Sequence, residues 1–184
     1  FNKKIGFTAA TSGPGMINLI QGIACSYFDS IPTFHFSGAV VTSQIRENKK
    51  IRQVGFQEME VVDLVKPVTK YAVLLTNKNM IRYELEKLLY MAKSGRPGPV
   101  LMDLPDDIQR ADINPKKLKG FRSPKKKNKK TIFLKKLAKL INTSKRPLVM
   151  FGNGIKTSKT EKELKSFIKI SKLPFIPTWA CLDI

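Results

Sequence analysis

The sequence has few of the residues that build disulfide frameworks and structural zinc sites. Its 184 residues include two cysteines, Cys25 and Cys181, and one histidine, His35. Two cysteines cannot make a disulfide framework, and a structural zinc site usually takes four Cys or His ligands. We therefore expect neither. We interpret Cys25 as a packing residue of an apolar helix, and we expect His35 to be buried and hydrogen-bonded.

Long apolar runs are also missing. No stretch approaches the roughly 20 residues that a membrane-spanning helix needs, and no basic-then-apolar leader opens the chain. We therefore expect no membrane partner and a cytoplasmic protein. The 42% share of hydrophobic residues is close to that of an ordinary globular domain, which argues against wholesale disorder.

Acidic residues are scarce, and the shortage is local. The chain has 34 Lys and Arg residues against 14 Asp and Glu, a formal charge of +20. Residues 113–160 hold 16 of the basic residues and no acidic one, whereas residues 1–112 carry 14 basic and 11 acidic side chains. The densest run, residues 116–130, contains Gly120 and Pro124 and has no apolar periodicity, which is typical of a solvated linker.

Lysine supplies most of this charge. Only 7 of the 34 basic residues are arginine, whose planar donors favour recognition of bases and phosphates. We therefore expect no nucleic-acid partner. A basic nucleic-acid-binding protein stays an alternative, and it would require binding to DNA that weakens steeply with salt.

Short apolar strands alternate with amphipathic helices along the chain. The spacing predicts helices over residues 17–28, 78–93, 131–142 and 160–172, and strands over residues 5–10, 33–36, 71–75, 99–104, 147–151 and 174–177. This alternation predicts an α/β fold with parallel sheets on both sides of the basic linker. Both ends of the sequence fall inside such units, so we expect an internal fragment of a longer polypeptide.

The sharpest local motif is the turn Thr11-Ser12-Gly13-Pro14-Gly15, between a predicted strand and a predicted helix. Its glycines allow tight turns and close approach of a ligand, and a helix N-terminus attracts polar groups. Thr11 and Ser12 are also good helix caps, and Pro14 suits a first helical turn, so capping explains the motif equally well. The motif is neither a Walker loop nor the dinucleotide-binding fingerprint.

Two further motifs have an ordinary structural explanation beside a functional one. Residues 55–60, GFQEME, offer a carboxamide and two carboxylates after a polar loop, although an exposed acidic start of a helix is the commoner explanation. Gly152-Asn153-Gly154 follows a predicted strand and could let a cofactor phosphate approach a helix. A turn at the end of the strand is the commoner explanation for this lone GxG.

Four segments, taken together and in order, resemble one family. They are GFTAATSGPGMINLIQGIACSYFDSIP, FQEMEVVDLVKPVTKY, SGRPGPVLMDLPDD and RPLVMFGNGI. Their combination is similar to the large, catalytic subunit of acetolactate synthase and related thiamine-diphosphate enzymes. The resemblance implies that residues 1–112 are the C-terminal part of a pyrimidine-binding domain. It makes residues 113–130 a basic linker, and residues 131–184 the N-terminal part of a Rossmann-like central domain.

The resemblance also implies a reaction and the residues that serve it. A 2-oxo acid substrate would lose CO₂, and the remaining fragment would join a second carbonyl compound. Thr11, Pro14, Asn18 and Gln57 would border thiamine diphosphate, with Gln57 and Phe56 as catalytic residues. A carboxamide such as Gln57 can hydrogen-bond the incoming carbonyl without donating a proton to the reacting carbon, and Phe56 would exclude water.

Further cofactors and a partner follow from the same resemblance. FAD, where the protein retains it, would contact Arg96, Gly152 and Gly154. The ligands of Mg²⁺ and the activating glutamate would lie outside these 184 residues. The cofactor site would lie between two subunits, which implies a homodimer or a homotetramer.

Two departures from the family pattern leave the product open. The sequence has Gly38-Ala39-Val40-Val41 where acetolactate synthases commonly have GQVP, and residues 104–107 are LPDD where they commonly have LPKD. The lost glutamine and the lysine-to-aspartate reversal alter the substrate entrance and the neighbourhood of FAD. Another thiamine-diphosphate-dependent 2-oxo-acid decarboxylase or lyase therefore stays an alternative.

Overall fold

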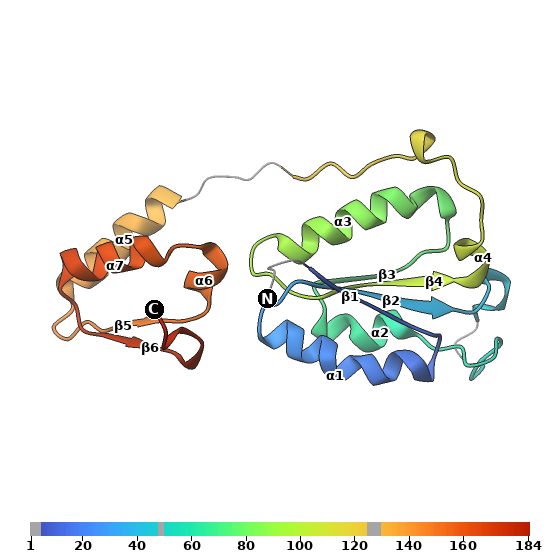
Figure 1. Ribbon diagram of the computed structural model, residues 1–184, viewed down its shortest axis with the longest axis horizontal. Helices are drawn as coiled ribbons and strands as arrows, with labels where there is room; N and C mark the ends of the chain where they lie inside the picture. The colour runs from blue at the N-terminus through green and yellow to red at the C-terminus, as the bar shows by residue number, and fades with distance from the viewer. Residues whose placement is uncertain (1–4, 48–49, 125–129) are drawn as a thin grey trace. The chain divides into compact units, whose positions relative to one another are not determined.

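The chain forms two compact units in the computed structural model, which describes residues 5–47, 50–124 and 130–184. The first unit is Phe1–Pro124 and the second is Lys125–Ile184 (Figure 1). Their boundary falls inside the predicted basic linker, whose residues 125–129 lie outside the described residues.

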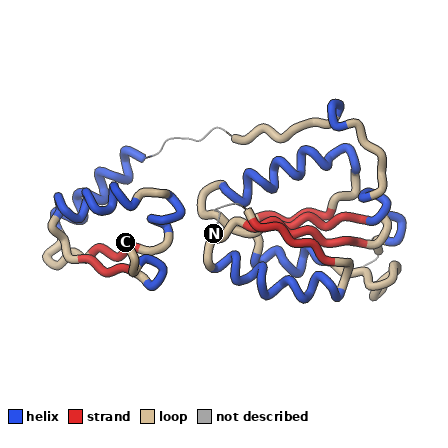
Figure 2. The backbone as a smooth tube through the Cα atoms, in the orientation of Figure 1, coloured by secondary structure: helices blue, strands red, loops and turns tan. Residues whose placement is uncertain are grey.

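The first unit is a parallel four-stranded sheet with helices on both faces (Figures 1 and 2). Helix α3 covers one face, and helices α1 and α2 cover the other. The strands lie in the order β1 (Gly6–Ala10), β2 (Thr33–Ala39), β4 (Val100–Pro105) and β3 (Tyr71–Leu74). The helices are α1 (Pro14–Phe28), α2 (Val61–Val65), α3 (Ile81–Lys93) and the short α4 (Asp106–Gln109), with 3-10 turns η1 (Thr42–Gln44), η2 (Lys66–Val68), η3 (Lys78–Met80) and η4 (Pro115–Lys117).

Alternation along the strands divides the core between the two faces. Phe34, Val100 and Met102 pack with α3, whereas Leu101 packs with α1 and α2. Strand β4 lies between β2 and β3 and is buried on both sides, which explains its nearly continuous apolar sequence. The same alternation places Ser37 and Asp103 on the face that α1 and α2 cover.

His35 lies in the centre of this sheet and is buried, as the sequence predicts. Its Nδ1 lies 2.6 Å from the Thr8 hydroxyl, and its Nε2 lies 2.8 Å from the Thr33 hydroxyl. Both ring nitrogens therefore have hydroxyl partners, and burial lowers the pKa of His35 to about 4, which favours the neutral ring near pH 7. The expectation for Cys25 is wrong, because this residue is exposed on α1.

The beginning of the basic run packs on the first unit. The amide N–H of Phe121 donates to Glu86 Oε2 on α3 at 2.7 Å, and its ring centroid lies 5.5 Å from those of Tyr83 and Tyr90. One aromatic side chain thus ties a lysine-rich segment to the surface of a helix.

The second unit is a small α/β structure with its own core. Its parallel strands β5 and β6 form a two-stranded sheet, and Phe151, Leu164 and Cys181 are the buried residues of its core. Its elements are α5 (Lys130–Thr143), β5 (Val149–Phe151), α6 (Gly154–Ser158), α7 (Glu161–Ser171), β6 (Phe175–Pro177) and the 3-10 turn η5 (Trp179–Cys181).

The structure confirms the predicted α/β class and every strand that the sequence predicts. Within the described residues, no helix is both long and apolar enough to cross a bilayer.

We predict that His35 makes the first unit sensitive to acid. The unfolded chain binds a proton at this ring below about pH 6.5, whereas the folded chain resists protonation down to about pH 4. The contribution of His35 is therefore complete above pH 6.5 and is lost as the pH falls toward 4, by up to about 1.4 kcal/mol per pH unit. In urea unfolding between pH 4 and 7.5, His35→Gln should lose less stability on acidification than the wild type. Equal slopes would contradict this role.

Candidate functional site

Two turns, one at Gly13 and one at Gln57, meet at the carboxyl edge of the sheet with their backbones in close contact. Gly13 has a φ of +59° and directly precedes α1, and Gln57 also has a φ of +59°. A Cβ atom at position 13 would lie 2.2 Å from the carbonyl oxygen of Gln57, so only glycine fits there. The expected caps, Thr11 and Ser12, do not cap the helix, because the N-cap is Gly13 and no side chain caps it.

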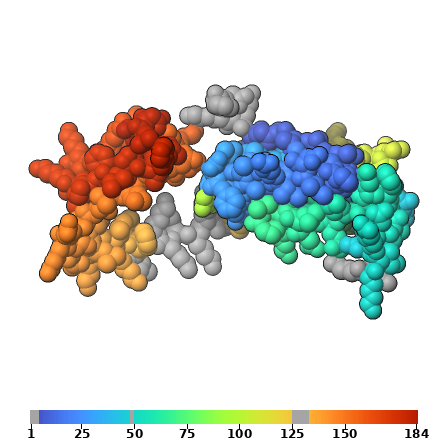
Figure 3. Space-filling model, turned by 90° about the horizontal axis from the view of Figure 1, so that it is seen from below, coloured from blue at the N-terminus to red at the C-terminus, as the bar shows by residue number. Residues whose placement is uncertain are grey.

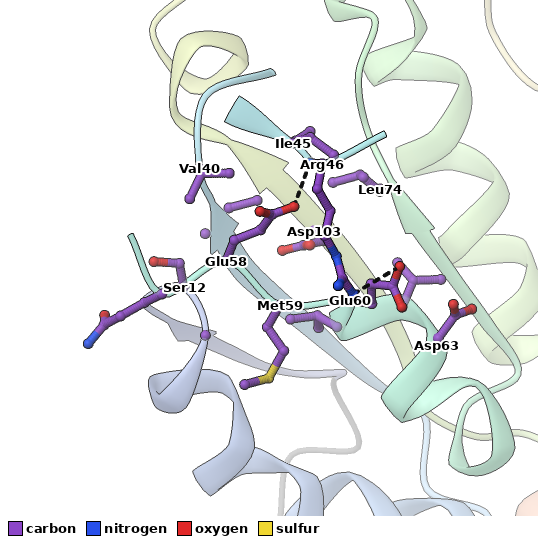
Figure 4. Close-up of a pocket in the computed structure, with 16 residues that line it drawn as sticks. Ser12, Val40, Ile45, Arg46, Glu58, Met59, Glu60, Asp63, Leu74 and Asp103 are labelled. Carbon is purple, nitrogen blue, oxygen red and sulfur yellow. Dashed lines mark hydrogen bonds and ion pairs between the residues drawn. The ribbon is translucent and has the colours of Figure 1, made fainter. Parts of the chain in front are cut away.

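The carboxylate of Glu58 organises the second turn. It accepts hydrogen bonds from three backbone N–H groups, those of Arg46 at 2.6 Å, Val54 at 2.7 Å and Gly55 at 3.4 Å. The guanidinium of Arg46 pairs with Glu60 at 3.3 Å (Figure 4) and donates to two carbonyl groups of the loop. The acidic residues do stand at the start of a helix, because Glu60 is the N-cap residue of α2, but no side chain caps that helix. The two carboxylates instead bind backbone N–H groups and Arg46, and so hold the loop before α2.

A cavity of about 200 Å³ lies beneath these turns, on the face of the sheet that α1 and α2 cover (Figure 4). Its walls combine apolar side chains with four carboxylates and one guanidinium. In Figure 3, which looks onto α1 and α2, the loop that leads to α2 projects beyond the helices. The lining residues are Ser12, Gly13, Gly38, Ala39, Val40, Ile45, Arg46, Gln57, Glu58, Met59, Glu60, Val61, Val62, Asp63, Leu74 and Asp103.

Asp103 is the buried acid of this cavity. Strands β2 and β4 place it directly opposite Ser37, whose hydroxyl donates to Asp103 Oδ1 at 2.6 Å. Burial raises the pKa of Asp103 to about 6, and the hydrogen bond from Ser37 opposes part of that rise. The side chain therefore changes its charge near pH 6.

The structure brings the predicted thiamine-diphosphate residues to one edge of the sheet. Thr11 and Pro14 belong to the first turn, Asn18 follows one helical turn later on α1, and Phe56 and Gln57 form the second turn. Phe56 and Gln57 are exposed, and Phe56 retains 80% of its accessible surface. Both side chains are thus available to a group outside the first unit.

The predicted FAD residues lie elsewhere. Arg96 donates to the Phe28 carbonyl at 3.0 Å and to the Ser30 hydroxyl at 2.6 Å, so it closes the C-terminal end of α1 at the opposite edge of the sheet. Gly152 and Gly154 belong to the second unit, where a Cβ atom at Gly152 would meet the Thr178 hydroxyl at 2.9 Å. Their contact with FAD stays a prediction.

The sequence analysis missed two residues of the cavity, Arg46 and Asp103, and also Ser37, which donates to Asp103. Asp103 had a signal, because it is the one charged residue in the apolar strand VLMDL. A buried charge requires a partner, so its position could have been singled out. Among the described residues, no group of three His, Cys, Asp or Glu side chains could hold a metal ion.

Comparison with known proteins places these motifs in context. The family described as thiamine pyrophosphate enzyme, central domain, matches residues 134–184, inside the second unit. The chain is 33% identical to acetolactate synthase 2, chloroplastic, of Nicotiana tabacum, over 94% of this chain and 26% of that protein. It is also 33% identical to the acetolactate synthase large subunit of Corynebacterium glutamicum, over 97% of this chain and 28% of that subunit.

A third relative agrees. The acetolactate synthase isozyme 3 large subunit of Escherichia coli K12 is 33% identical over 94% of this chain and 30% of that subunit. The chain thus spans between a quarter and a third of the length of these three relatives. The alignments run through both units, which includes the turns at Gly13 and Gln57.

We predict that Gly13→Ala destabilises the first unit by about 2 kcal/mol or more, because the new Cβ would collide with the Gln57 carbonyl and the backbone would be strained. Gly22→Ala is the matched control, since a Cβ atom at this position in the middle of α1 would have nothing within 4 Å. That variant should gain about 0.5–1 kcal/mol. Urea unfolding of both variants checks the pair. Equal stabilities would mean that the two turns do not constrain each other.

We predict the opposite acid response for Asp103. The folded state binds a proton at this carboxyl from about pH 6 downward, whereas the unfolded chain binds it only near pH 3.8. Protonation therefore favours the folded state as the pH falls from 6 to 4. Asp103→Asn removes this gain, so its stability should fall more steeply over that interval than that of the wild type. A shallower fall in urea unfolding would refute the assignment.

Proposed function

Because the chain belongs to the thiamine pyrophosphate enzyme family, as its similarity to acetolactate synthases establishes, we propose that it forms part of a thiamine-diphosphate-dependent carboligase. The proposed reaction decarboxylates a 2-oxo acid and joins the product to a second carbonyl compound. The observation that carries this proposal is the meeting of the turns at Gly13 and Gln57 over one cavity at the carboxyl edge of a parallel sheet.

The cavity fits the aminopyrimidine end of the cofactor. Its volume of about 200 Å³ is below the roughly 300–1,000 Å³ of sites that enclose a whole small molecule. Apolar side chains such as Val40, Met59 and Leu74 suit the faces of a flat heteroaromatic ring. Asp103, with its raised pKa, and the backbone near Gly13 offer polar groups to the edge of such a ring.

The same cavity does not suit a diphosphate. The carboxylates of Glu58, Glu60, Asp63 and Asp103 outnumber the guanidinium of Arg46 among the lining charges. We therefore propose that the diphosphate and its Mg²⁺ are held by residues outside the first unit. A second subunit is the proposed source, and FAD stays a separate prediction.

Each proposed residue has a distinct task. Bound thiamine diphosphate supplies the carbon nucleophile and the electron sink for loss of CO₂. The carboxamide of Gln57 donates a hydrogen bond to the carbonyl oxygen of the substrate and orients it. Phe56 shields the reacting carbon from water. Because Phe56 is exposed on the first unit, this shielding requires another surface that covers its ring. Thr11, Pro14 and Asn18 border the ring.

A decarboxylase or lyase of the same family is the second candidate, and two positions of this sequence, 39 and 106, support it. Ala39 lines the cavity where a glutamine is common in acetolactate synthases, which removes one hydrogen-bonding group. Position 106, where a lysine is common, holds an aspartate that pairs with Arg110 at 2.9 Å, so it offers no cation to a substrate carboxylate. Both changes weaken the binding of a second acidic substrate.

The proposed location is cytoplasmic.

The test uses the polypeptide encoded by the complete reading frame that contains this chain. With thiamine diphosphate, Mg²⁺ and pyruvate, it should release CO₂ and form acetolactate. Gln57→Ala should lower the rate of acetolactate formation by about tenfold or more, because one oriented hydrogen bond is lost. Gln21→Ala, an exposed carboxamide on α1, is the matched control and should leave the rate unchanged.

The outcomes separate the two candidates. CO₂ release without a condensed product would support the decarboxylase. No CO₂ from pyruvate or from larger 2-oxo acids would overturn both candidates. An unchanged rate and product ratio in Gln57→Ala would remove Gln57 from the proposed site.

A further inference from the structure

We propose that Glu58 is the positioning residue for Gln57, and that its negative charge sets the geometry in which the Gln57 carboxamide meets the substrate. This inference rests on the proposed function and adds a residue that acts through another. Glu58 does not need to touch the substrate for this role.

The contacts of Glu58 join two separate parts of one loop, Arg46 and the adjacent residues Val54 and Gly55. Its Oε1 accepts from the N–H of Arg46, and its Oε2 accepts from the N–H groups of Val54 and Gly55. One carboxylate thereby links the backbone at Arg46 to the backbone at Val54 and Gly55. In Figure 4 the side chain of Glu58 points toward Arg46, and a dashed line marks the hydrogen bond between them.

The contacts of Glu58 favour its charged form. Partial burial raises the pKa of the Glu58 carboxyl, but the three backbone donors and the Arg46 guanidinium lower it by more. The net shift of the pKa is therefore downward. A neutral carboxamide has one acceptor oxygen and an NH₂ group, and that NH₂ would face backbone donors. Glu58→Gln therefore loses part of the set while it keeps the size of the side chain.

The contacts of Glu58 fix Gln57 because Gln57 directly precedes Glu58 in the chain. Gln57 has a left-handed backbone, with φ at +59°, a conformation that a non-glycine residue holds only when its surroundings impose it. Its carbonyl oxygen is seated against Gly13, and Glu58 N donates to the Gly55 carbonyl at 3.2 Å. Glu58 thus ends a tight turn whose middle residues are Phe56 and Gln57.

The experiment compares Glu58→Gln, Glu58→Asp and Glu86→Gln in the polypeptide from the complete reading frame. Glu86→Gln is the matched control, because Glu86 also accepts a backbone N–H, that of Phe121, and pairs with Arg82, but on α3 away from the cavity. Steady-state kinetics with pyruvate, the product ratio and amide hydrogen exchange are measured on each protein.

The expected result is specific to positioning. Glu58→Gln should lower kcat about 10- to 100-fold with little change in KM, since a displaced group loses transition-state contact. It should also speed amide exchange at Arg46, Val54 and Gly55 and leave β4 protected. Glu58→Asp should recover part of kcat, because it keeps the charge, and Glu86→Gln should match the wild type.

Three results would overturn the proposal. Wild-type kcat in Glu58→Gln, with or without faster exchange, would show that the loop does not position Gln57. Loss of protection throughout the sheet would show a role in folding alone. An inactive wild type would remove the reaction itself, and in that case the exchange data would still tell whether Glu58 closes the loop, so the two failures are distinguishable.

Discussion

The carbonyl oxygen of Gln57 lies so close to Gly13 that a Cβ atom at position 13 would be only 2.2 Å from it. This approach joins two turns that are more than 40 residues apart in the sequence, and each must hold an unusual backbone to permit it. Gly13 can do so freely, whereas Gln57 needs support from its neighbours. The hydrogen bonds to Glu58 provide that support, so the loop, the start of α1 and the roof of the cavity form one mechanical unit.

The parallel sheet explains why polar residues collect at this place. Side chains at alternate positions of β2 and β4 face α1 and α2, which brings His35, Ser37 and Asp103 to the same buried face. Each has a hydrogen-bond partner, as burial requires, but the two ionisable ones respond to acid in opposite directions. Their contributions to stability largely offset each other between pH 6 and 4. The sheet can therefore carry a titrating acid in its cavity without a large net change in stability over that interval.

Local pattern was sufficient to predict the strands and the longer helices, because apolar spacing of this kind is written in neighbouring residues. It could not predict that β4 lies between β2 and β3, since that order depends on pairing across distant segments. The motif at Thr11–Gly15 predicted a turn in the right place but the wrong cap, because the contact with Gln57 demands a glycine before the helix. Asp103 escaped notice inside an apolar run. Glu58 and Glu60 were indistinguishable in sequence, and only the folded loop shows that one binds backbone amides and the other binds Arg46.

Charge separates the candidate site from the rest of the chain. The formal charge of +20 resides mostly in residues 113–160, whereas four carboxylates and a single guanidinium line the cavity. Under the proposed function, that lining would repel a diphosphate, so residues outside the first unit would hold it. Phe56, beside Gln57 in the sequence, is 80% exposed. Under the proposed function, both features require a facing surface that is electropositive and partly apolar. On this proposal the first unit would supply the half of the site that orients a ring and a carbonyl group, and a different surface would bind the phosphates.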